Sequence, residues 1–215
     1  MRISFLCSDH THPVNDYLFM WIKNNSNKHE IELVRQKKHL SGGDILFLIS
    51  CTEIIDSRDR NAYTSCLVLH ASDLPQGRGW SPHIWSILEG KEELTLTLLE
   101  ASNKVDSGKI WKKLKFQVPK HALWNEINKQ VFEREIELIN FAVSNFNNIV
   151  PKPQNLSIEP TYYPKRTPAD SAIDPQKSIE SQFDKIRVCD PERFPAYIEM
   201  YGEKYKITLE KINDK

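Results

Sequence analysis

Apolar residues along the chain form short runs and periodic stretches that predict strands alternating with helices. Short aliphatic runs bounded by turn residues are typical of buried strands, whereas apolar positions at helical spacing are typical of helices. The predicted strands are residues 2–7, 30–34, 44–50, 66–69, 94–99 and 110–118, and the predicted helices are residues 14–25, 82–88 and 123–146. Ser81 is expected to cap the helix that starts at Pro82. This alternation predicts an α/β fold with a Rossmann-like, mostly parallel sheet and flanking helices.

The C-terminal third of the chain has a different character. Prolines interrupt the pattern over residues 147–182, and such a long irregular segment in a compact protein is often functional when it is ordered. Short strands are expected at residues 185–188, 196–198 and 204–209. Residues 149–215 are therefore expected to form an irregular proline-rich segment with a small β appendage, packed on a main domain of residues 1–148.

Composition and charge restrict the class of protein. The 29 Lys and Arg residues balance 29 Asp and Glu residues, which argues against a general nucleic-acid binder. No apolar run reaches the ~18–20 residues that span a bilayer. The first residues do not resemble a secretory signal, so a cytoplasmic protein is expected. The four cysteines form no Cys-x-x-Cys pair and are expected to be reduced thiols, with no zinc site.

Two strand exits carry candidate chemistry. The run at 66–69 is followed at once by His70, and the strand at 94–99 is followed by a loop with Asp106 beside Gly108. Side chains on adjacent strand exits can converge on one substrate, so this His and Asp form a candidate acid–base pair. Taken singly, a strand-end histidine is more often satisfied by the backbone, and an aspartate before glycine is a common turn residue.

Further motifs follow the same order as in a known family. The matching positions are His70, Ser72, Leu74 and Pro75, then Arg78-Gly79 and Ser81-Pro82, then Asp106-Ser107-Gly108, and finally the stretch from Tyr162 to Asp170 with Arg166-Thr167-Pro168. This ordered set resembles the folate-dependent N-formyltransferases, whose catalytic domain occurs in methionyl-tRNA formyltransferase, and it is nearest to the members that act on nucleotide sugars. The family has an asparagine two residues before its histidine. Val68 stands there in this chain, and a valine cannot donate to an oxyanion.

The resemblance implies an activity and roles for individual residues. It implies that residues 1–148 are a formyltransferase catalytic domain that uses 10-formyltetrahydrofolate as co-substrate. The acceptor would be the amine of a nucleotide-linked amino dideoxy sugar, as in surface glycan biosynthesis. His70 would stabilise the oxyanion and transfer protons, and Asp106 would orient the imidazole and accept the substrate proton; no metal would be needed.

The resemblance also suggests where the two substrates bind. The expected folate-binding residues are Leu48, Thr52, Glu53, Ile54, Ile55, Ala101, Ser102, Asn103 and Lys104. The expected acceptor-binding residues are Ser72, Asp73, Arg78, Trp80, Ser81 and His83. Trp85, Tyr162 and Tyr163 could also stack on a sugar or base, although aromatic residues at such positions more often belong to the core. His10 and His12 lie in a loop with no evident third ligand, so they are weak metal candidates.

Other functions stay open. A catalytically weakened folate- or sugar-binding homologue fits the valine at position 68. Formylation of another amine, such as a glycinamide ribonucleotide, or a different acyl or carbamoyl transfer on the same sheet would fit the remaining motifs. The expected partner is a small molecule, without nucleic acid or membrane, and a homodimer is compatible with the sequence.

Overall fold

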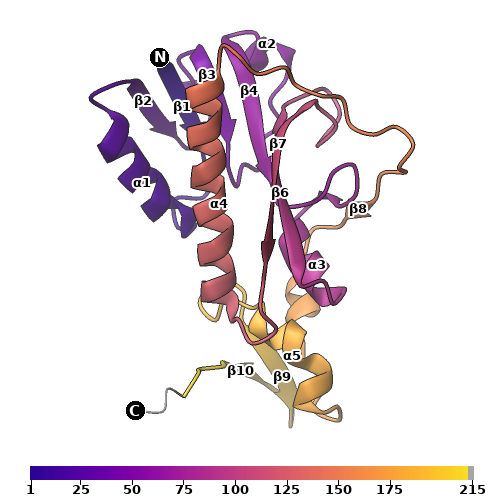
Figure 1. The fold of residues 1–215 in the computed structure, drawn as a ribbon. Coiled ribbons are helices and arrows are strands. Elements are labelled where there is room, and N and C mark those ends of the chain that lie inside the picture. Colours follow the sequence, from indigo (N-terminus) through magenta and orange to yellow (C-terminus); the bar gives the residue numbers. More distant parts are fainter. Residues whose placement is uncertain (213–215) are drawn as a thin grey trace.

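The computed structural model describes residues 1–212, and its centre is a six-stranded sheet with the order β2-β1-β3-β4-β6-β7 (Figure 1). The strands are β1 Arg2–Leu6, β2 Glu30–Val34, β3 Gly43–Leu48, β4 Tyr63–His70, β6 Glu93–Glu100 and β7 Ile110–Gln117. The helices are α1 Val14–Asn25, α2 Ser57–Arg60, α3 Pro82–Leu88, α4 Trp124–Asn145 and α5 Ile179–Arg187, with short 3-10 turns at Lys37–His39 and Pro168–Ser171. Two small sheets pair β5 Arg78–Gly79 with β8 Tyr162–Tyr163, and β9 Ala196–Met200 with β10 Glu203–Ile207.

The predicted Rossmann-like, mostly parallel α/β sheet is confirmed. Strands β1, β2, β3 and β4 pair in parallel, whereas β6 runs antiparallel to both β4 and β7. The loop between β6 and β7 covers only residues 101–109, and a connection without a crossover helix joins antiparallel strands. That loop carries Asp106 and begins after Glu100, which pairs with Leu67 of β4.

Each face of the sheet has its own apolar layer. Helices α1 and α4 lie together on one face (Figure 1), where Phe5 stacks on Phe47 with ring centroids 5.2 Å apart. Side chains alternate between the faces of a strand, so Leu67 and Leu69 join this helix-covered core. Val68 therefore lies on the opposite face and packs against a smaller apolar cluster. That cluster consists of Leu6, Leu46, Leu48, Ile55, Tyr63 and Cys66. His70 shares that face by the same alternation.

The irregular segment after α4 runs back over the sheet. We call residues 151–163 the strap; it is the orange segment that curves past β6 and β7 in Figure 1. Its start pairs with the sheet through two backbone hydrogen bonds between Ile110 and Lys152. Its end forms β8, which pairs in parallel with β5. The strap is thus ordered against the main sheet, while a domain division at residue 148 stays a prediction.

The structure overturns one predicted element of the C-terminal region and confirms another. The predicted strand at residues 185–188 is wrong, because these residues end helix α5 or follow it directly. Ser178 caps that helix by accepting a hydrogen bond from the Ser181 N–H, and Ile186 is buried in a small core under the β9–β10 hairpin. A four-residue apolar alternation is too short to separate strand from helix. The expected small β appendage is confirmed by that hairpin.

The start of α3 and the cysteines also bear on the expectations. Helix α3 begins at Pro82 as predicted, but Ser81 makes no side-chain capping bond and adopts a left-handed φ of 47°.

Within the described residues all four cysteines are free thiols. Burial raises the pKa of Cys7 to about 11 and that of Cys66 to about 12, so these two thiols are unreactive core groups.

Candidate active site at the ends of β4 and β6

His70 and Asp106 lie together at one edge of the sheet. His70 is the last residue of β4, and Asp106 lies in the loop between β6 and β7. The distance from His70 Nδ1 to Asp106 Oδ1 is 3.6 Å, and each side chain is only 8% exposed. The structure therefore brings together the two residues that the sequence singled out as an acid–base pair.

The backbone fixes which ring nitrogen of His70 faces the carboxylate. His70 Nε2 lies 2.8 Å from the carbonyl oxygen of Gly77. A carbonyl oxygen only accepts hydrogen bonds, so Nε2 carries a hydrogen and donates it to Gly77. Nδ1 then faces Asp106 and is the ring atom left for proton transfer. A proton on Nδ1 would be shared between the carboxylate and a developing negative charge nearby.

Asp106 is held in an unusual backbone conformation. Its φ is 52°, a left-handed value that aspartate tolerates better than most residues, and its Oδ2 accepts a hydrogen bond from the Gly79 N–H at 2.9 Å. Two residues later a Cβ atom at Gly108 would stand 1.8 Å from the Glu100 carbonyl oxygen. Only glycine fits there, which explains the Asp-x-Gly pattern in physical terms.

The strap forms hydrogen bonds with both loops of the candidate site, the loop at Gly77 and the loop at Asp106 and Gly108. The sequence did not indicate this role for any individual residue. The Gln154 side-chain amide donates to the carbonyl oxygens of Asp106 at 2.8 Å and Gly108 at 3.0 Å. Thr161 Oγ1 accepts from the Gly77 N–H at 2.8 Å. The signal in the sequence was the long proline-rich segment itself, a kind of segment that is often functional when it is ordered, and it did not identify these residues.

Some of the predicted folate-binding residues lie on the face that carries His70. Leu48 and Ile55 belong to the small apolar cluster on that face, and Ala101 packs against it. Arg60 connects the two loops, since its guanidinium donates to the Ile55 carbonyl at 2.7 Å and to Asn103 Oδ1.

The other predicted folate-binding residues differ in their surroundings. Ile54 is 79% exposed, and Thr52 is exposed as well. Glu53 accepts a hydrogen bond from the Lys37 N–H, and Ser102 donates to the Lys104 carbonyl. These residues border the two loops that Arg60 joins, and their contact with folate stays a prediction.

The predicted acceptor-binding residues do not form one group. Ser72 Oγ is buried without a hydrogen-bond partner, but Asp73 pairs with Lys113 at 2.6 Å and is largely exposed. Arg78 is only 5% exposed and directs its guanidinium into the interior. Trp80 is 41% exposed, with the Lys165 ammonium 4.9 Å from its ring centroid. Of this set, Asp73 and Trp80 are the exposed residues.

His83 belongs near the catalytic pair. Burial, helped by the positive charge of Arg166, lowers the pKa of His83 to about 4. A neutral imidazole in the first turn of α3 can accept or donate a hydrogen bond without adding a charge. This places the residue beside the site, and its contact with an acceptor stays a prediction.

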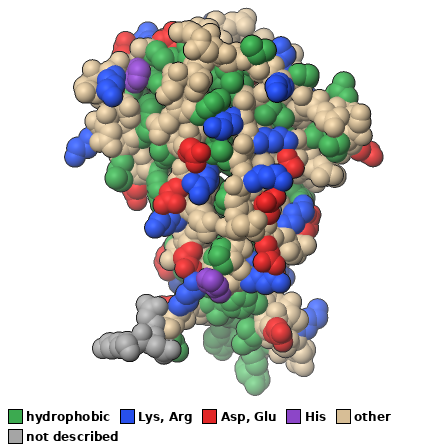
Figure 2. Space-filling view, in the orientation of Figure 1, with side chains coloured by type: hydrophobic (Ala, Val, Ile, Leu, Met, Phe, Trp, Pro, Cys, Tyr) green, Lys and Arg blue, Asp and Glu red, His purple; other side chains and the backbone are tan. Residues whose placement is uncertain are grey.

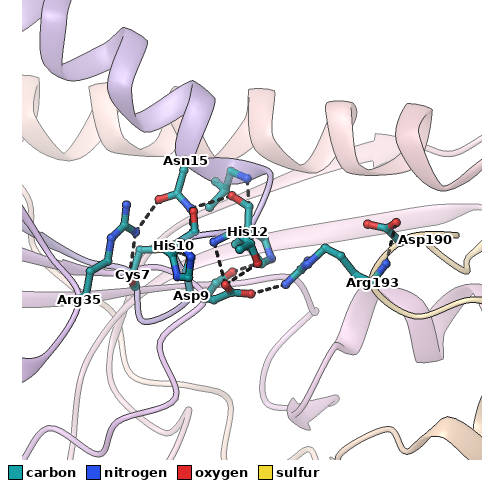
Figure 3. Close-up of polar contacts among 11 residues, drawn as sticks. Cys7, Asp9, His10, His12, Asn15, Arg35, Asp190 and Arg193 are labelled. Carbon is teal, nitrogen blue, oxygen red and sulfur yellow. Dashed lines mark hydrogen bonds and ion pairs between the residues drawn. The ribbon is translucent and has the colours of Figure 1, made fainter.

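The first loop of the sheet is organised by Asn15 (Figure 3). Its amide donates to the carbonyls of Asp9, His10 and His12, and its Oδ1 accepts from Arg35 at 2.6 Å. His12 Nδ1 accepts from the Val14 N–H, and burial lowers the pKa of His12 to about 4. His12 therefore serves the loop structure. Among residues 1–212, no three His, Cys, Asp or Glu side chains are grouped so that they could hold a metal ion.

The surface of the molecule shows mixed charges. Lysine and arginine side chains are interspersed with aspartate and glutamate over the face seen in Figure 2. Among the described residues, no helix is both long enough and apolar enough to cross a membrane.

The fold and the site together define an α/β protein with a His–Asp pair at the carboxyl edge of its sheet. The formyl transferase family profile matches residues 3–143, so the chain belongs to the formyl transferase family. A methionyl-tRNA formyltransferase from Rickettsia bellii is 31% identical over 163 residues, which are 75% of this chain and 52% of that protein. The chain thus spans about half the length of the curated relatives it matches.

Solved structures share the fold over nearly the whole chain. HypX from Aquifex aeolicus, in complex with tetrahydrofolic acid, has a TM-score of 0.81 at 22% identity and covers 97% of this chain and 37% of its own. A sugar N-formyltransferase from Shewanella has a TM-score of 0.73 at 16% identity and covers 100% of this chain and 99% of its own. The likeness therefore extends beyond the catalytic sheet to the strap and the C-terminal hairpin.

Proposed function

We propose that this chain transfers a formyl group from 10-formyltetrahydrofolate to an amine. The observation that carries the proposal is the pair of His70 Nδ1 and Asp106 Oδ1 at 3.6 Å, in a member of the formyl transferase family. The bound tetrahydrofolate in HypX is consistent with a folate donor. The two adjoining loops at residues 48–55 and 101–104 offer backbone groups and apolar side chains on the face that holds the pair.

The geometry assigns a part of the reaction to each residue. The acceptor nitrogen attacks the formyl carbon, a C–N bond forms, and the carbonyl oxygen becomes an oxyanion. A hydrogen on His70 Nδ1 forms a hydrogen bond to this oxygen and stays on the ring, because Nε2 is already used by Gly77. Asp106 takes the proton that the attacking nitrogen loses. The bond from the formyl carbon to the folate nitrogen then breaks, and that nitrogen takes up the proton, leaving a formamide and tetrahydrofolate.

For the acceptor we propose the amine of a nucleotide-linked amino dideoxy sugar. Trp80 and Tyr162 are 41% and 54% exposed near the site, and aromatic faces of this kind stack on sugars and bases. Lys165 lies over Trp80 and supplies a positive charge for a phosphate. The solved sugar N-formyltransferase from Shewanella matches this chain along its full length, which supports the same acceptor class.

Methionyl-tRNA is the second candidate acceptor. It is favoured by the curated relatives, which are methionyl-tRNA formyltransferases at about 30% identity. The formal net charge of zero weighs against it, because binding to RNA phosphates depends on an excess of positive charge. A glycinamide ribonucleotide acceptor and a weakened homologue that binds without turnover are the remaining alternatives.

One experiment separates these candidates. The purified chain is incubated with 10-formyltetrahydrofolate and, in parallel, with a panel of nucleotide amino sugars, with methionyl-tRNA and with glycinamide ribonucleotide. Mass spectrometry then records the gain of one formyl group, and tetrahydrofolate release is followed in the same samples. Formylation of a nucleotide sugar alone supports the proposal. Formylation of methionyl-tRNA alone contradicts the sugar acceptor, and folate binding without any product contradicts the enzyme.

A further inference from the structure

We infer that Gln154 is a positioning residue, which holds Asp106 against His70 and is itself held by Arg78. The inference rests on the proposed formyl transfer. Gln154 lies in the strap, 48 residues from Asp106 in the sequence, and is only 7% exposed. It touches neither the His70 ring nor the Asp106 carboxylate in any recorded hydrogen bond, so its influence on the chemistry is exerted through the backbone of the Asp106 loop.

Every polar atom of the Gln154 amide has a partner that fixes its orientation. The carbonyl oxygens of Asp106 and Gly108 can only accept, so Nε2 must face them. The guanidinium of Arg78 can only donate, so Oε1 must face it, at 2.7 Å from Nη2. The amide therefore has one orientation in which it satisfies all three neighbours.

These bonds close a ring around the catalytic carboxylate. Arg78 is followed directly by Gly79, whose N–H donates to Asp106 Oδ2 at 2.9 Å. The Asp106 carbonyl is bound by Gln154, and Gln154 is bound by Arg78. Asp106 is thus held at its carboxylate by one end of β5 and at its carbonyl by the strap, and neither contact can shift without moving the other.

The Asp106 loop needs such a restraint. Asp106 has a φ of 52°, a strained value that persists only where surrounding contacts impose it. Just before it, Val105 is 59% exposed and Lys104 is exposed too, so this side of the loop gains little from packing. Loss of the two bonds from Gln154 is therefore expected to let the loop relax and carry the carboxylate away from His70.

The sharpest variant is Gln154→Glu. Glutamate has the same length and can still accept from Arg78, but its carboxylate cannot donate to the two carbonyl oxygens and is repelled by them. A small displacement of a catalytic group reduces turnover by roughly 10- to 100-fold. We expect kcat to fall by that amount while the Kd for the folate donor changes by less than about threefold. Asn155→Ala is the matched control, because the Asn155 side chain is exposed and its Oδ1 accepts a hydrogen bond from the Ser157 N–H, within the strap.

A double-mutant cycle tests whether Gln154 acts through Asp106. In an Asp106→Asn background, Gln154→Glu is expected to cause almost no further loss, because residues that act as a unit are not additive. If the same loss in kcat occurs in both backgrounds, Gln154 supports the fold in general and the inference is wrong.

A second readout does not depend on turnover. The ring-nitrogen chemical shifts of His70 at fixed pH, assigned with His70→Asn, report whether a carboxylate faces Nδ1. In Gln154→Glu, or in Gln154→Ala if the first variant does not fold, they are expected to move toward the values of Asp106→Asn, while Asn155→Ala leaves them unchanged. Shifts that stay at the wild-type values overturn the inference. A wild-type chain without formyl transfer overturns the proposed function, and the chemical shifts then still decide the role of Gln154.

Discussion

Val68 and His70 project from the same face of β4, two residues apart, and Val68 packs there against the cluster of Leu48 and Cys66. A valine next to the catalytic histidine offers a methyl surface and no hydrogen-bond donor. The surroundings of position 68 are apolar, so the pocket is built around an aliphatic side chain. In the proposed reaction, stabilisation of the oxyanion therefore depends on His70 and on groups outside this position.

Replacement of Val68 by asparagine tests this arrangement. The new amide could donate to the oxyanion, but it would also enter an apolar cluster, where an unpaired amide costs roughly 1–3 kcal/mol. We expect the wild type to be active and Val68→Asn to gain less than about tenfold in rate, equivalent to under ~1.4 kcal/mol in the barrier. The formylation rate of both proteins with the best acceptor decides the question. An inactive wild type that asparagine rescues strongly would show that the chain is a weakened relative.

His70→Asn removes the group that we expect to donate to the oxyanion. Asparagine is too short to take the place of Nε2 at the Gly77 carbonyl, and its amide can stand only near the position of Nδ1, where it cannot transfer a proton. Turnover is expected to fall by a factor of at least ~100, with thermal unfolding nearly unchanged. Steady-state kinetics measures the loss. Circular dichroism confirms the fold, and near-normal turnover in a folded variant would remove His70 from the mechanism.

Asp106→Asn preserves the shape of the site and removes its negative charge. The amide oxygen can still accept from the Gly79 N–H, so the loop conformation is expected to survive. Turnover should fall sharply because the base for the attacking nitrogen is lost, while the Kd for the folate donor changes little. Calorimetry measures the Kd for the folate donor and steady-state kinetics measures turnover, so the two effects can be separated. If only the donor affinity falls, Asp106 is a binding residue and its catalytic assignment is wrong.

The sequence was sufficient to predict the sheet and to single out His70 and Asp106, because both depend on local patterns, while the catalytic roles of the two residues stay a prediction. Apolar runs mark the buried strands, and His70 ends one of them. Asp106 lies in the loop after β6, which is antiparallel to β4, so its approach to His70 depends on the path of that loop. Helix α5 was missed because the pattern near Ile186 is too short to reveal its period, and its capping residue Ser178 lies well upstream. The antiparallel direction of β6 depends on pairing between distant segments.

Gln154 and Thr161 could not be identified from the sequence for a different reason. Their partners lie 46 to 48 and 84 residues away, and nothing in the local sequence of a polar residue in a proline-rich segment indicates where its side chain will bind. The proline content predicted only that the segment lacks regular structure. Long-range contacts of this kind appear only once the strap is placed against the sheet.

The last prediction concerns Glu135, a buried carboxyl group on α4. Its side chain is 7% exposed, and its Oε2 has no hydrogen-bond partner. Burial raises the pKa of Glu135 from 4.5 to about 8. Below pH 4.5 the carboxyl is protonated in both the folded and the unfolded chain. As the pH rises from there toward 8, only the unfolded chain ionises, so the folded state loses stability over this range.

Glu135→Gln removes this ionisation and keeps the size of the side chain. The variant is expected to be more stable than the wild type near neutral pH, by roughly 1–3 kcal/mol, and the difference should shrink toward zero as the pH falls through the ordinary range of a glutamate. Chemical denaturation of both proteins at several pH values between mildly acidic and neutral measures the difference in the free energy of unfolding. Glu133→Gln, on the exposed side of the same helix, is the control and should show little dependence on pH. A stability difference for Glu135→Gln that does not change with pH would mean that the carboxyl ionises normally in the folded protein, and that its burial does not keep it protonated.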